Sequence, residues 1–291
     1  MKVQILILFI YISLFHIAFS NDTKRFDTRI EINTDKLEYY VYEPIVLSYH
    51  LSNNCEFGPS IGPSDIEENL TIQNEFGHIF PSTSRSYYQD KYRLQLGEQY
   101  NCCFNLLENY GPENGNFSFS CRCLLPGEYS VQFIWKEDGY AELKSNEIGI
   151  VITNPPVSDE GALQLFHKGM AKLDEHEVDT SICLFDSLIN NYPESMYVPM
   201  AMKEYMLLNF ATKVRKSDHQ KAMLMAKRML EKHGNHYYIG VANFVIRKYY
   251  KKCRDKQSIK KYYKELRNRT NKKKLKGIID VILTQLELEE E

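Results

Sequence analysis

The stretch that decides the fold of the first half of the chain is TDKLEYYVYEPIVLSYHLSN, residues 34–53. Its last nine residues, 45–53, contain an alternating apolar run, and Tyr42-Glu43-Pro44 comes directly before them. A period of two places successive side chains on opposite faces of a β-strand. The stretch therefore predicts strands around a turn and not a catalytic centre.

Similar short runs fill residues 28–153, with Gly, Pro or Asn between them: RIEINTD, NLTIQNEFG, YRLQLGEQYNCCFNLL, GEYSVQFIWKE and NEIGIVIT. Short alternating strands separated by turn residues predict an antiparallel β-sandwich. Val131, Phe133 and Trp135 alternate within one run, so we expect them in its core.

Four short motifs in this half resemble motifs of known domain families. Residues 34–47 match T-D-K-x-x-Y-x-x-x-E-P-I-x-L, and LQLGE, PGEYSV and SNEI follow at residues 94–98, 126–131 and 145–148. The set resembles immunoglobulin-like or macroglobulin-like domains of secreted bacterial proteins. The resemblance implies an Ig-like sandwich over residues 21–153, whose motifs are structural and not catalytic.

The pattern changes after TNPPVS, where two prolines interrupt any strand and predict a linker at residues 154–158. From 159 to 291 the apolar period is 3.6, beginning with Ala162, Phe166 and Met170. Seven such stripes predict an all-α region of about seven amphipathic helices. The chain is therefore expected to be a multidomain α+β protein.

The helical half contains FDSLINNYPES, residues 185–195, which resembles the F-x-x-L-I-x-x-Y-P-x-S turn of tetratricopeptide-like envelope proteins. Second helices of successive hairpins are expected near Asp179, Asp218 and Ser258, about 40 residues apart. The resemblance implies stacked helical hairpins with a surface that binds a protein partner.

Residues 1–20 have the pattern of a secretory signal peptide: one Lys, an apolar run and Ala18-Phe19-Ser20 before a cleavage site. No cysteine lies near this site, so a lipid anchor is not expected. No later segment is apolar enough to span a bilayer. We therefore expect a secreted or periplasmic protein, with an uncleaved N-terminal anchor as the alternative.

Cysteine use is compatible with an oxidising compartment. The five candidates for one or two disulfides lie in the first half: Cys55, Cys102, Cys103, Cys121 and Cys123. A zinc site is the less favoured alternative, because CC…CxC lacks the usual CxxC spacing.

The sequence contains no GxSxG, GxxxxGK[ST], GxGxxG or HExxH motif, and we assign no catalytic, cofactor or metal residue. His233 and His236 share a predicted turn, and residues 174–177 form an acidic one. Both are more simply explained as polar turns than as metal sites.

The strongest charge feature is residues 247–276, which hold fifteen Lys and Arg against Asp255 and Glu265. Tyrosines are interspersed with the basic residues at helical spacing. This pattern favours tyrosines packed in the seam between helices and lysines on the solvent-exposed face. A surface for an acidic polymer is the alternative, with these candidate residues: Lys251, Lys252, Lys260, Lys261 and Lys264.

These observations lead to three ranked hypotheses. The first is an exported, non-enzymatic scaffold that binds a protein through its helical half. The second is a binder of glycan or an anionic surface that uses helices 247–276. An enzyme is the third, because no nucleophile, base or metal set is recognisable. The formal net charge of −2 and the predicted export argue against nucleic acid as the partner.

Overall fold

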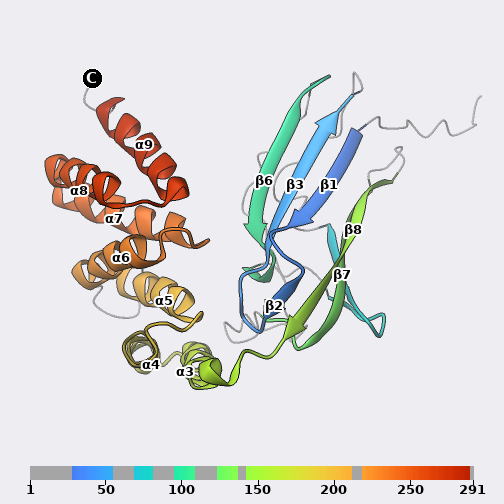
Figure 1. Ribbon diagram of the computed structural model, residues 1–291, viewed down its shortest axis with the longest axis horizontal. Helices are drawn as coiled ribbons and strands as arrows, with labels where there is room; N and C mark the ends of the chain where they lie inside the picture. Colours follow the sequence, from blue (N-terminus) through green and yellow to red (C-terminus); the bar gives the residue numbers. More distant parts are fainter. Residues whose placement is uncertain are drawn as a thin grey trace, which may run out of the picture. The chain divides into compact units, whose positions relative to one another are not determined.

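The computed structural model describes residues 28–54, 69–80, 95–108, 123–136, 142–211 and 218–288. Figure 1 shows strands in the first part of these residues and helices in the second. This arrangement confirms the prediction of an α+β chain with a strand-rich first part and an all-helical second part. The predicted signal peptide, residues 1–20, lies outside the described residues.

One sheet is antiparallel and contains the opening stretch. It consists of β1 (Thr28–Thr34), β3 (Val46–Asn53) and β6 (Gln99–Asn105) in the order β1-β3-β6. Alternate residues of β3, namely Leu47, Tyr49 and Leu51, are at most 2% exposed. The alternation in the sequence therefore exists because one face of this strand is buried.

The second sheet has the order β2-β8-β7-β4-β5. Its strands are β2 (Glu38–Tyr40), β4 (Leu70–Asn74), β5 (Ile79–Phe80), β7 (Gly127–Trp135) and β8 (Leu143–Thr153), and a short 3₁₀ helix, η1 (Leu106–Glu108), follows β6. Val131, Phe133 and Trp135 are buried on β7, which confirms their predicted place in the core.

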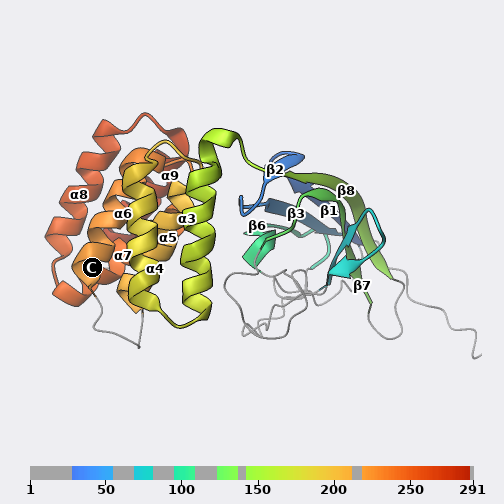
Figure 2. The same cartoon turned by 90° about the horizontal axis from the view of Figure 1, so that it is seen from below.

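Seven helices follow within the described residues. They are α3 (Val157–Asp174), α4 (Val178–Asn191), α5 (Val198–Ala211), α6 (His219–His233), α7 (Ile239–Cys253), α8 (Lys256–Arg269) and α9 (Lys273–Leu288). Each helix packs against the next one in the chain, and Figure 2 shows α3 to α6 side by side. Their apolar stripes are buried between neighbours, as the 3.6-residue period predicts.

The helices contain an internal repeat. Helix α4 begins at Val178 and α6 at His219, and α5 begins at Val198 and α7 at Ile239, so both helices recur after 41 residues. The turns before α5 and α7 each carry a buried tyrosine at the equivalent position, Tyr197 and Tyr238. The expected spacing of about 40 residues between hairpins is therefore present.

The helical unit includes a segment that is distant in sequence. Among the described residues, segment 38–44 belongs to the same compact unit as the helices. The buried Tyr197 hydroxyl donates a hydrogen bond to the Val41 carbonyl oxygen over 2.9 Å, and the Tyr42 ring meets Phe166 edge-on at 5.3 Å between centroids. Tyr42 has a φ of 67°, a left-handed conformation that a bulky residue adopts only when its surroundings impose it.

Candidate binding groove on helices α7, α8 and α9

A groove of about 1090 Å³ lies on the last three helices. Side chains of α7 and α9 form most of it, and Lys256 and Ile259 from the start of α8 complete it. This volume is typical of a site for a large ligand or a segment of a partner protein. We therefore treat the groove as the candidate functional site.

The groove has an apolar floor, formed by Phe244, Ile259, Ile278, Val281, Ile282 and Leu286. Two of these residues are largely exposed, because Phe244 is 49% exposed and Val281 is 58% exposed. Large apolar side chains that stay in contact with water and share one concavity are typical of a surface that binds a partner.

The charged residues of the groove are all basic. They are Arg247, Lys248, Lys251, Arg254 and Lys256, and no aspartate or glutamate lies among the described residues that line it. Arg247 and Lys251 are four residues apart and share one side of α7, and Arg254 is the C-cap residue that ends this helix. The charge of the groove therefore favours an anionic occupant.

Two contacts position the basic side chains beside the floor. The Arg247 guanidinium donates through Nη1 to the Gln285 side-chain oxygen over 3.0 Å, which joins α7 to α9. The Lys248 ammonium lies 5.5 Å from the centre of the Phe244 ring, within the range of a cation–π contact. An apolar ligand on Phe244 therefore has a positive charge beside it.

One buried polar side chain also lines the groove. Asn243 is 5% exposed, and its Oδ1 accepts a 3.0 Å hydrogen bond from the Tyr263 hydroxyl of α8. Among the described residues its Nδ2 has no hydrogen-bond partner. Burial raises the pKa of Tyr263, so its hydroxyl keeps the proton that it donates to Asn243.

The five lysines singled out from the sequence are not gathered at one site. Lys251 lines the groove, whereas Lys252, Lys261 and Lys264 are exposed and Lys260 is half-buried, and none of these four is a lining residue. Of the tyrosines between the basic residues, Tyr262 and Tyr263 are buried, whereas Tyr249 and Tyr250 are half-buried.

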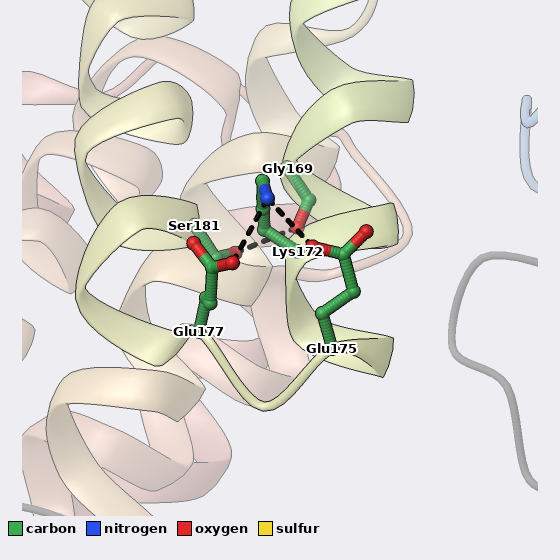
Figure 3. Close-up of polar contacts among 5 residues, drawn as sticks. All are labelled: Gly169, Lys172, Glu175, Glu177 and Ser181. Atoms are coloured by element: carbon green, nitrogen blue, oxygen red, sulfur yellow. Dashed lines mark hydrogen bonds and ion pairs between the residues drawn. The ribbon is translucent and has the colours of Figure 1, made fainter.

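The acidic turn at residues 174–177 contacts a lysine of the same unit (Figure 3). Lys172 Nζ lies 2.6 Å from Glu175 Oε2 and 2.9 Å from Glu177 Oε1, and the Ser181 hydroxyl donates to the Gly169 carbonyl oxygen over 2.9 Å. The hydrogen bond from Lys172 is also the main cause of the lowered pKa of Glu177. This cluster joins the end of α3 to the start of α4.

Of the two histidines of the predicted turn, His233 ends α6 and His236 lies between α6 and α7. Both line a polar cavity of about 390 Å³, together with Glu43 and Glu194. Burial lowers the pKa of His233, and it lowers that of His236 to about 4. Among the described residues, no three His, Cys, Asp or Glu side chains are grouped as metal ligands would be.

The predicted disulfides stay a prediction. Cys55 and Cys121 lie outside the described residues, as does the side chain of Cys102. Cys103 is exposed on β6 and Cys123 is half-buried, and no disulfide joins cysteines within the described ranges.

The groove residues Asn243 and Phe244 were not identified from the sequence. A signal for Asn243 was present: it shares a helix face with Ile239, Ala242 and Ile246, where an apolar residue is expected. Phe244 carried no such signal, because only the positions of α8 and α9 make it part of a concavity.

Comparison with protein-family models finds no match for this chain, and comparison with curated proteins finds none either. Within the residues that the structure describes, no helix has the length and apolar character needed to cross a membrane.

Proposed function

We propose that this chain is an exported, non-enzymatic interaction protein whose helical unit binds an acidic amphipathic helix of a protein partner. The observation that carries the proposal is the groove of α7, α8 and α9, which combines an apolar floor with a rim of five basic residues. An amphipathic helix could place its apolar face on such a floor and its carboxylates on such a rim. In this proposal the strand-rich part is an Ig-like support and the helices are a tetratricopeptide-like stack.

The spacing of the cations favours a helix over a small amphiphile. Arg247 and Lys251 lie one turn apart on α7, a rise of about 6 Å, and Arg254 follows at the C-cap of the helix. A single carboxylate or phosphate group contacts one or two cations, whereas carboxylates at helical spacing can meet the whole row. The groove volume of about 1090 Å³ also exceeds what most small ligands fill.

A second candidate function is binding to an acidic polymer or an anionic surface. The observation in its favour is that Lys252, Lys261 and Lys264 are exposed and outside the groove. Such binding depends on total charge and weakens steeply with salt. Groove binding also buries apolar surface, so part of its affinity persists in high salt.

The two functions are separated by changes inside and outside the groove. A side chain added at Gly277 meets no atom within 4 Å at its Cβ, so Gly277→Leu projects into the groove without a clash at its base. Leucine also favours helix by about 1 kcal/mol relative to glycine, so the variant is expected to fold.

The experiment uses the full chain with a photo-crosslinking amino acid at Val281, exposed to the native host's envelope and medium. The proposal expects crosslinks to an acidic segment with apolar residues at helical spacing, lost in Gly277→Leu and Lys251→Glu but kept in Lys261→Glu. Equal losses in Lys251→Glu and Lys261→Glu, with full sensitivity to salt, would favour the polymer. Crosslinks that persist in Gly277→Leu would contradict a groove site.

A further inference from the structure

The buried side chain of Asn243 gives the groove a polar feature that an apolar floor alone lacks. Its Nδ2 has no hydrogen-bond partner within the described residues, and the side chain is 95% covered. A buried amide donor without a partner is costly, so an unused one next to a binding groove indicates a partner that arrives with the ligand.

The neighbouring helix fixes the orientation of this amide. Tyr263 is completely buried, and its hydroxyl donates to Asn243 Oδ1 over 3.0 Å. An asparagine amide has one oxygen acceptor and one nitrogen donor group, so a hydroxyl that occupies the oxygen leaves the nitrogen for another acceptor. The Nδ2 group of Asn243 therefore requires an acceptor, such as an oxygen atom of the ligand, and not another donor.

The internal repeat shows that this polar group is not needed by the fold of the hairpin. In the preceding hairpin the position 41 residues earlier is Met202, which is completely buried. The equivalent positions Ala201 and Ala242, next to them, are both buried alanines. The hairpin is therefore built with an apolar residue at this position in α5 and a polar one in α7, where the groove lies.

We infer that Asn243 is a specificity-determining residue of the groove, which selects helices that carry an oxygen acceptor within their apolar stripe. This inference rests on the proposed function of the groove. The expected occupant has glutamates toward Arg247 and Lys251 and one Gln, Asn, Ser or Thr among the apolar residues that cover Phe244 and Val281. An all-leucine stripe would leave Nδ2 without an acceptor and would lack this hydrogen bond, so it would bind more weakly.

The test uses designed 18-residue helical peptides with a leucine stripe and a flanking row of glutamates. One peptide has leucine throughout its stripe, and each of the others has one leucine replaced by glutamine. Fluorescence anisotropy measures their affinity for the full chain, for Gly277→Leu, and for the double variant Asn243→Leu/Tyr263→Phe. The double variant removes donor and acceptor together, so neither is left buried alone.

The inference expects at least one glutamine peptide to bind the unmodified chain about tenfold more tightly than the all-leucine peptide. The preference should reverse in Asn243→Leu/Tyr263→Phe and all binding should be lost in Gly277→Leu. If the all-leucine peptide binds best while Gly277→Leu still abolishes binding, Asn243 has no such role and the groove function stands. If Gly277→Leu changes nothing, the groove function fails and the inference with it.

Discussion

His236 shows how the burial of one side chain links stability to pH. It lies in the turn between α6 and α7, where burial, assisted by the nearby His233 and Lys274, lowers its pKa from 6.5 to about 4. Glu43, Glu194 and Lys232 line the same cavity. The folded protein therefore holds a neutral imidazole at pH values where an unfolded chain holds a protonated one.

We predict that stability falls as the pH is lowered from about 6.5 to about 4. Above this window His236 is neutral in both states, and within it the unfolded chain binds a proton that the folded chain does not. At about 1.36 kcal/mol per pKa unit, the loss is at most about 3 kcal/mol. Urea unfolding at several pH values measures it, and His236→Gln should make the curve less steep, with His233 supplying part of what is left.

The exposed His176 provides the matched control for this prediction. His176→Gln makes the same chemical change at an exposed position and shows what the substitution does by itself. A slope that is equally steep in His236→Gln and in the unmodified chain would show that another group is responsible.

At the scale of the elements, the helices differ in how closely they approach one another. Gly169 on α3 lies against α4, where an added Cβ would be 2.6 Å from Phe185 Cε1, and Phe185 is completely buried. Gly277 on α9 has no such neighbour within 4 Å. The first glycine permits tight packing, whereas the second leaves the groove open.

We predict opposite effects of the same substitution at these two glycines. Gly169→Ala should lower the free energy of unfolding by about 1–3 kcal/mol, because Phe185 or the helix must move. Gly277→Ala should raise it by up to about 1 kcal/mol, because alanine is the better helix former. Urea denaturation followed by circular dichroism measures both. A stabilised Gly169→Ala would show that α3 and α4 pack less tightly than described.

At the scale of the whole molecule, segment 38–44 belongs to the helical unit although strand residues follow it in the chain. The hydrogen bond from Tyr197 to the Val41 carbonyl oxygen joins positions 156 residues apart. A fragment that starts after the predicted linker therefore lacks part of its own unit, which is why the binding experiments use the full chain.

We predict that Tyr197→Phe destabilises the protein by about 1–3 kcal/mol, because it removes the buried donor to the Val41 carbonyl while keeping the ring. Thermal and urea unfolding of the full chain measure this loss. The control is Tyr192→Phe, which removes the hydroxyl of a half-buried tyrosine in the α4–α5 turn. Equal effects of the two changes would argue against a special role for the Val41 contact.

The sequence by itself determined the coarse architecture. Residues 46–53 form a strand and the stripe of Ala162, Phe166, Met170 and Leu173 forms a buried helix face, as their periods predict. Burial of one face imposes a period of two on a strand and of 3.6 on a helix, so this information is local. The Ig-like and tetratricopeptide-like identities, the signal peptide, the disulfides and the function stay predictions.

Only the tertiary structure decided where the candidate site lies. The groove extends from Gly240 on α7 to Leu286 on α9. Lys251 lines it and Lys252 does not, a difference that the run of fifteen basic residues in the sequence did not indicate. The sequence likewise did not indicate that segment 38–44 packs with the helices, because its partners Phe166 and Tyr197 are more than 100 residues away along the chain. Periodicity records which face of an element is buried, whereas a concavity depends on how several elements pack together.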